Sequence, residues 1–151
     1  MSEYSRKDIA MKYFTEGYNC AQSVALAFSD LVDIDKTVLA KLSSSFGGGM
    51  GRLREVCGAV TGMFMIAGIL YGYGDNETGE AKAEHYAFIQ NLAKEFEQVC
   101  GSYICRELLE VDGAQNPKPE ARTKEYYEKR PCSELVGIAA EILERKISER
   151  K

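Results

Sequence analysis

The sequence predicts an all-α protein: a single-domain bundle of roughly five to seven helices around a glycine-rich central helix. Several segments repeat apolar residues every three or four positions, the spacing that gives a helix one apolar face. The chain has no sustained alternation of apolar and polar residues, the pattern typical of strands. No low-complexity tract or long linker divides the 151 residues, and this length can bury a substantial core. We therefore expect residues 1–151 to form one domain.

Three helices are expected in the first third of the chain, each preceded by a residue whose side chain can accept a hydrogen bond from the first turn. Asn19 is followed three residues later by Gln22, the arrangement of a capping box. Apolar residues recur on one face of each segment. The expected helices, each with its cap, are approximately 6–15 after Ser5, 20–31 after Asn19, and 35–45 after Asp35.

The central helix is expected over about 55–71, after a glycine-rich segment. Residues 56–73 contain no charged side chain and reach the length of a membrane span. Four glycines in this stretch lower its apolar content, so we interpret it as a buried helix and expect no membrane span. Its small residues let another helix, a bulky cofactor or a second copy of the chain in a homodimer approach closely.

The second half of the chain is expected to hold three further helices. Gly101 is typical of a helix C-terminus, and two prolines between residues 112 and 120 favour an extended loop. The expected order is a polar link at 74–78, a helix ending near residue 100, a short helix at about 102–110, the loop at 112–120 and a last helix at about 133–149.

Composition and charge limit the classes of function. A formal net charge of −4 argues against a nucleic-acid partner. The first eight residues contain no apolar segment of the kind found in a secretory signal, so a cytoplasmic location is expected. In a reducing compartment the five cysteines are more often free, metal-bound or catalytic than bridged, and an odd number fits poorly with a complete disulfide framework.

Four of the five cysteines stand where a helix is expected to begin. The unpaired backbone N–H groups of a helix start carry partial positive charge, which favours a thiolate over a thiol. Cys100 differs, because it precedes the expected helix C-terminus at Gly101, where the helix dipole disfavours a thiolate. We therefore take four cysteines as the candidate redox or metal-binding residues: Cys20, Cys57, Cys105 and Cys132.

These four thiols support three kinds of chemistry. If they converge, they can bind an iron–sulfur cluster or a related metal for electron transfer or redox sensing. Backbone N–H donors of the adjacent glycine segment, and the positive charges of Arg52 and Arg54, suit such an anionic group. They can also pair during thiol–disulfide exchange without metal, or hold a structural zinc ion in a non-catalytic domain. The chain contains no C-x-x-C pair, so the spacing of the cysteines leaves these alternatives open. It also does not indicate whether the protein is an enzyme, and it identifies no redox partner. This glycine segment, which would support the site as a loop, contains Gly47, Gly48, Gly49 and Gly51.

The sequence also resembles a known family. Residues 57–62, Cys-Gly-Ala-Val-Thr-Gly, form a CGAxxG motif that contains Gly58 and Gly62, with one cysteine before it and two after it. This layout resembles the C-GCAxxG-C-C family of small proteins, which is named for its cysteine pattern and described as redox-active. Further similar segments lie at 18–23, 46–51 and 101–109, so the resemblance covers nearly the whole chain.

The resemblance implies that the four motif cysteines are the functional ones and that Cys100 is extra. A related domain resembles part of the split-Soret cytochromes, which suggests an iron–sulfur centre, while thiol–disulfide exchange and a structural zinc site stay open. The resemblance brings no substrate and no partner with it.

Overall fold

The computed structural model describes residues 5–74 and 79–151, and this part of the chain is helical, as predicted. Its only β-type pairing is a single antiparallel bridge between Val56 and Ile104. The predicted polar link at 74–78 lies outside the described residues apart from Gly74. The helices are α1 (Arg6–Thr15), α2 (Cys20–Leu26), α3 (Lys36–Ser44), α4 (Gly47–Met50), α5 (Gly58–Tyr71), α6 (Gly79–Cys100), α7 (Cys105–Leu109), α8 (Lys124–Lys129) and α9 (Cys132–Glu149), with a 3-10 turn, η1, at Ser29–Leu31.

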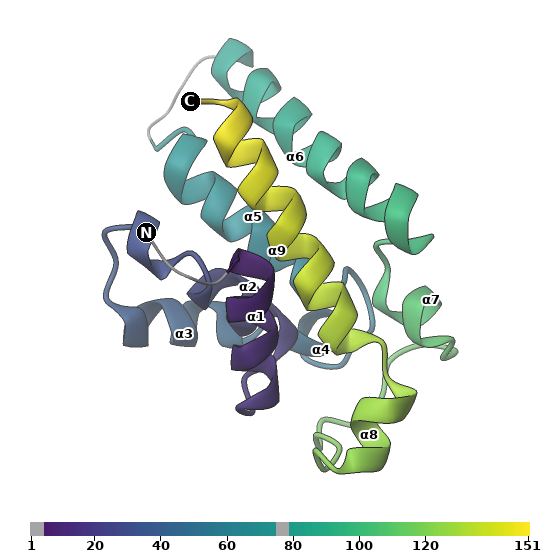
Figure 1. Cartoon of the computed structure of the whole chain (residues 1–151). Helices are drawn as coiled ribbons and strands as arrows, with labels where there is room; N and C mark the ends of the chain where they lie inside the picture. The colour runs from purple at the N-terminus through teal and green to yellow at the C-terminus, as the bar shows by residue number, and fades with distance from the viewer. Residues whose placement is uncertain (1–4, 75–78) are drawn as a thin grey trace.

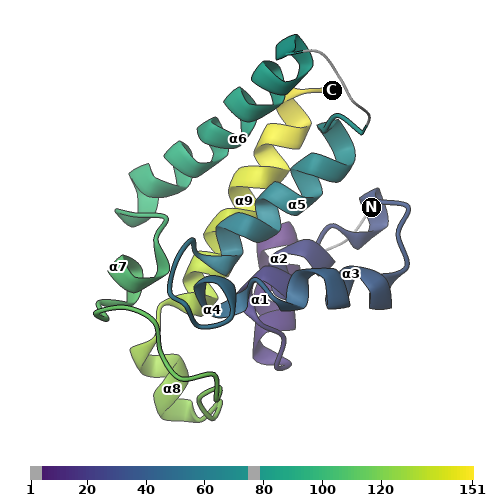
Figure 2. The same ribbon diagram turned by 180° about the vertical axis from the view of Figure 1, so that it is seen from behind.

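Two long helices, α5 and α9, form the centre of the bundle (Figures 1 and 2). The N-terminal helix α1 packs along α9, α2 packs along α5, and α6 contacts both central helices. The shorter helices α4, α7 and α8 gather at one end of the molecule, near the start of α9. This end therefore brings together the starts of several helices that lie far apart in the sequence.

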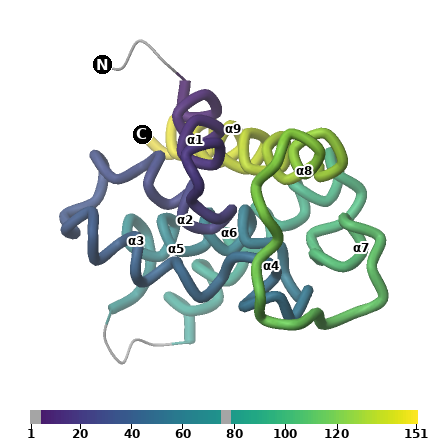
Figure 3. The backbone as a smooth tube through the Cα atoms, turned by 90° about the horizontal axis from the view of Figure 1, so that it is seen from below, coloured from purple at the N-terminus to yellow at the C-terminus, as the bar shows by residue number. Residues whose placement is uncertain are grey.

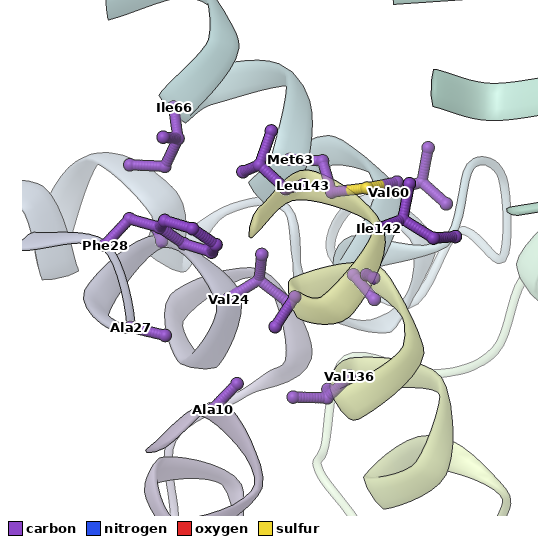
Figure 4. Close-up of a cluster of buried hydrophobic side chains, with 14 of the residues drawn as sticks. Ala10, Val24, Ala27, Phe28, Val60, Met63, Ile66, Val136, Ile142 and Leu143 are labelled. Carbon is purple, nitrogen blue, oxygen red and sulfur yellow. The ribbon is translucent and has the colours of Figure 1, made fainter. Parts of the chain in front are cut away.

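The hydrophobic core lies where α1, α2, α5 and α9 meet (Figure 4). Phe28 and Met63 are fully buried there, together with Val24, Ile66 and Leu143. In α5 every residue from 58 to 63 is buried, so the expectation of a buried central helix is confirmed for its first half. Among the described residues, none of the helices is both long enough and apolar enough to cross a membrane.

Local capping explains the starts of the first three helices. The first helix spans the predicted residues, with Ser5 Oγ accepting a hydrogen bond from the backbone N–H of Asp8. At α2 the capping box forms in both directions: Asn19 Oδ1 accepts from the N–H of Gln22 at 2.8 Å, and Gln22 Oε1 accepts from the N–H of Asn19 at 3.0 Å. Asp35 caps α3 in the same way.

Three expected boundaries are wrong, and one helix was not expected. The central helix begins at Gly58 instead of about residue 55. The second helix ends at Leu26 instead of near residue 31, and a 3-10 turn follows it. The short helix after Gly101 begins at Cys105, because Ser102 Oγ accepts a hydrogen bond from the N–H of Ile104 in a local turn before the helix. The short helix α8, which carries no buried residue, was not expected.

The glycine-rich segment forms a left-handed turn. Residues 48–51 all have positive φ, between 62° and 72°, a conformation that non-glycine residues rarely adopt. At Gly49 a side chain would not fit, because an added Cβ would lie 2.6 Å from Cys105 Cβ and 2.7 Å from the Cα of Arg54. The turn therefore places the backbone of this segment directly against the start of α7.

Candidate functional site

The four cysteines predicted to act together line one cavity of about 380 Å³. Cys20, Cys105 and Cys132 are the first residues of α2, α7 and α9, and Cys57 is the residue before α5. We call these four residues the cavity cysteines. Cys100, the last residue of α6, does not line this cavity.

Backbone pairing joins the segments that carry Cys57 and Cys105. The N–H of Cys57 donates to the carbonyl of Tyr103 at 2.8 Å, and the N–H of Cys105 donates to the carbonyl of Glu55 at 2.5 Å. These two hydrogen bonds flank the bridge between Val56 and Ile104. Two sulfurs separated by 48 residues are thereby held at the same wall of the cavity.

Close packing of two helix starts places Cys20 beside Cys57. A Cβ added at Gly58 would overlap the Sγ atom of Cys20 and would lie 2.9 Å from the carbonyl oxygen of Phe46. The start of α2 can therefore reach the start of α5 only because residue 58 has no side chain. Further along α5, Gly62 meets the carbonyl of Ala21 in the same way, at 2.9 Å from an added Cβ.

The predicted supporting glycines fall into two groups. Gly47, Gly48, Gly51 and Gly58 line the cavity itself. Gly49 and Gly62 lie outside its lining, and the structure shows them at close helix contacts, against α7 and α2 respectively.

Burial dominates the electrostatics of the thiols. It raises the pKa of the Cys20 thiol, raises that of Cys57 well above its ordinary value of 9.0, and raises that of Cys132 from 9.0 to about 12. Backbone N–H groups oppose the pKa rise: those of Gly48 and Ala21 stabilise the Cys20 thiolate, and that of Ala59 stabilises the Cys57 thiolate. The N–H groups at Cys20 and Cys57 thus act in the expected direction, but loss of hydration outweighs them, so the net change in pKa is upward.

Positive charge surrounds the cysteines. Four arginines and a single carboxylate, Glu120, are among the residues that line the cavity. Arg130 pairs with Glu120 at 2.6 Å, whereas Arg54 donates to Cys105 Sγ at 3.4 Å. The four arginines are Arg52, Arg54, Arg122 and Arg130.

The loop between α7 and α8 passes α4 (Figure 3). Pro117 and Pro119 in this loop line the cavity. Arg122 links the end of the loop to the first helix and the residues after it. Its guanidinium donates to the carbonyl of Phe14 in α1 at 2.9 Å and to that of Tyr18 at 3.1 Å. Arg122 and Arg130 were not predicted from the sequence, because no local motif marks them and tertiary contacts alone bring them to the site.

The donor set suits a soft metal or a metal cluster better than a hard cation, since thiolates are soft ligands. All five cysteines are free thiols. Within residues 5–74 and 79–151, no group of three or more His, Cys, Asp or Glu side chains is arranged so that it could hold a metal ion. The cavity thus offers four thiols and surrounding positive charge, without a preformed site for one ion.

Comparison with known proteins gives one family. The family model described as "Putative redox-active protein (C_GCAxxG_C_C)" matches residues 18–146. This range includes all four cavity cysteines and the glycine turn at 47–51. Neither the curated proteins nor the solved structures yield a match.

Proposed function

The chain belongs to the C-GCAxxG-C-C family, described as redox-active, and from this premise we propose that its cavity cysteines bind an iron–sulfur cluster for electron transfer or redox sensing. One observation carries the proposal: the four motif cysteines line one cavity, and Cys100 does not. Four cysteine thiolates are the ligand set of [2Fe–2S] and [4Fe–4S] clusters. When bound, such a cluster supplies one-electron exchange.

The size of the cavity suits a centre of several metal atoms. Zinc binds thiolates at about 2.3 Å in tetrahedral geometry, which places the four sulfurs about 3.8 Å from one another. The described part of the chain holds no group of side chains arranged for a single ion. A cavity of about 380 Å³ between the four thiols leaves room for a larger centre.

The protein supplies three things to such a centre. The cavity cysteines provide the ligands, and each comes from a different helix start. Backbone N–H groups of Gly48 and Ala59 stabilise negative charge on Cys20 and Cys57, as hydrogen bonds to cluster sulfurs do in general. The prolines and Tyr126 in the cavity wall limit access of water to the sulfurs.

The raised pKa values favour metal ligation over thiol–disulfide exchange. Exchange requires attack by a thiolate, whereas burial raises the pKa of three cavity cysteines and keeps them protonated near neutral pH. A bound metal removes this obstacle, because a coordinated thiol loses its proton. The same burial that suppresses exchange protects a bound centre from solvent.

Anaerobic purification of the whole chain, followed by measurement of iron, sulfide, zinc and the visible spectrum, tests the proposal. We expect iron and sulfide with charge-transfer absorbance in the wild type and in the control variant Cys100→Ser. The Cys57→Ser variant should lose both while keeping its helical circular dichroism. Loss of iron in Cys100→Ser would refute the ligand assignment.

Two other outcomes would replace the proposed function. Stoichiometric zinc without iron or sulfide would indicate a structural zinc site. A metal-free chain whose free thiol count falls by two or four on mild oxidation would indicate exchange between the cavity cysteines.

A further inference from the structure

Arg54 has an unusual position for a charged residue. It is 4% exposed, and among the described residues it is the only charged one that is buried. Its guanidinium donates to Gln115 Oε1 at 2.8 Å and to Cys105 Sγ at 3.4 Å. Within the described ranges, no carboxylate oxygen lies within 4.0 Å of its nitrogens.

This burial is costly in the metal-free chain. A buried ion without a counter-charge costs several kcal/mol, and the neutral amide of Gln115 compensates for only part of that. The other arginines of the cavity differ from Arg54. Arg130 pairs with a carboxylate, and Arg52 donates to the carbonyl of Asn116 at 2.7 Å.

The backbone at Arg54 is also held in an unfavourable conformation. Its φ is 62°, a left-handed value that a non-glycine residue adopts only at a cost in free energy. Neighbouring groups maintain it: the N–H of Arg54 donates to the carbonyl of Gly48 at 3.3 Å, and its carbonyl accepts from the N–H and Nη1 of Arg106, both at 3.2 Å. Backbone strain that the surroundings maintain is a reason to look for a function of the side chain.

We propose that Arg54 is the built-in counter-charge of the cysteine cavity, donating to the sulfur of Cys105 as a ligand and raising the reduction potential of the bound cluster. This inference rests on the proposed function. Reduction transfers one electron to the cluster from an external one-electron donor, an iron–sulfur or flavin carrier, or dithionite in the assay. That electron adds one negative charge beside a fixed positive charge, which stabilises the reduced form more than the oxidised form.

Potentiometric titration of the anaerobically purified protein, followed in the visible spectrum, tests the inference with Arg54→Gln and Arg54→Lys. In Arg54→Gln the ratio of reduced to oxidised cluster at a fixed potential should fall at least tenfold, which corresponds to a midpoint lower by about 59 mV for one electron. Arg54→Lys keeps the charge and loses the planar fork, so its shift should be smaller and in the same direction. The matched control Arg145→Gln removes an arginine that pairs with Glu95 and does not line the cavity, so its midpoint potential should stay near that of the wild type.

A second measurement separates this role from a purely structural one. In the metal-free chain, Arg54→Gln removes a buried charge, so its midpoint of denaturation should equal or exceed that of the wild type, even as iron retention falls. A clear loss of stability of the metal-free variant, or an unchanged midpoint potential in a fully loaded Arg54→Gln, would overturn the inference. If Arg54→Gln retains too little iron for titration, the stability of its metal-free form decides: stability equal to or above that of the wild type supports the inference, and a clear loss overturns it.

These results distinguish the inference from the function on which it rests. A wild-type chain without iron and sulfide would refute the proposed function, and the role of Arg54 with it. If the wild type contains iron and sulfide but substitutions of Arg54 leave the midpoint potential unchanged, only the role of Arg54 would be refuted.

Discussion

Gly58→Ala tests the close approach of α2 and α5, on which the meeting of Cys20 and Cys57 depends. Alanine normally stabilises a helix relative to glycine, by up to about 1 kcal/mol. At Gly58, however, the new methyl group would overlap Cys20 Sγ and would lie 2.9 Å from the carbonyl oxygen of Phe46 and 3.1 Å from the backbone nitrogen of Ala21. Two of these three neighbours are backbone atoms, which cannot move aside without shifting α2.

A matched control lies on the same helix. At Gly68 an added Cβ would meet no atom within 4 Å, so Gly68→Ala should gain most of the helix-propensity term of about 1 kcal/mol. Overpacking at Gly58 should cost roughly 1–3 kcal/mol and offset that gain. We therefore expect Gly58→Ala to be less stable than Gly68→Ala by about 1–3 kcal/mol, or roughly 2–12 °C in Tm for a domain of this size.

Denaturant unfolding of the metal-free variants, followed by circular dichroism, measures this difference directly. The slope of the transition should stay constant while its midpoint moves, since neither change alters the surface exposed on unfolding. Iron and sulfide content should fall in Gly58→Ala and stay at the wild-type level in Gly68→Ala. Equal stabilisation by both substitutions would refute the close packing of the two helix starts.

Two further predictions follow from the titration of the site and from its capping. Burial raises the pKa of Cys132 from 9.0 to about 12, so the folded state binds the thiol proton more tightly than the unfolded state does. The free energy of unfolding should therefore fall as pH rises above about 9. Between pH 8 and pH 10 this thiol should lower the free energy of unfolding by about 1.4 kcal/mol. Denaturant titrations at several pH values should show that metal-free Cys132→Ala lacks this loss of stability. Equal pH dependence of stability in the variant and the wild type would contradict the prediction. Asn19 caps α2 and also donates to the carbonyl of Ser44 at 3.0 Å. Asn19→Ala should therefore lower the free energy of unfolding by about 1–2 kcal/mol. Ser5 only caps its helix, so Ser5→Ala should lower it by about 0.5–1 kcal/mol. Equal costs in the same unfolding assay would show that the contact with Ser44 contributes nothing.

Local signals predicted the starts of the first three helices well and the end of the second poorly. The bounds of α1 follow from Ser5 and the residues next to it, because a capping hydrogen bond involves only neighbours in the sequence. The end of α2 was misplaced because apolar residues continue through Phe28 and Leu31, and periodicity does not distinguish an α-helix from the 3-10 turn found there. The helix α8 escaped prediction because it has no buried residue and therefore no apolar stripe.

The composition of the site could be predicted, whereas its assembly could not. Capping residues and the CGAxxG motif identify the candidate cysteines one by one. Their meeting depends on hydrogen bonds such as the one from Cys57 to Tyr103 and on the absence of a side chain at Gly58. Both are contacts between residues distant in the sequence, and Arg122, which ties the loop between α7 and α8 to Phe14 across 108 residues, belongs to the same class.

The raised pKa values, together with the placement of the cysteines at helix starts, suggest what the cavity requires. A helix N-terminus stabilises a nearby negative charge by about 0.3–1 kcal/mol. The rise in the pKa of Cys132 from 9.0 to about 12 corresponds to about 4 kcal/mol against ionisation, so the helix start alone cannot produce a thiolate there. One guanidinium, that of Arg54, contacts a cavity sulfur, and one positive charge cannot balance four thiolates. A metal centre would supply the missing positive charge, and its binding should therefore release protons and stabilise the fold together.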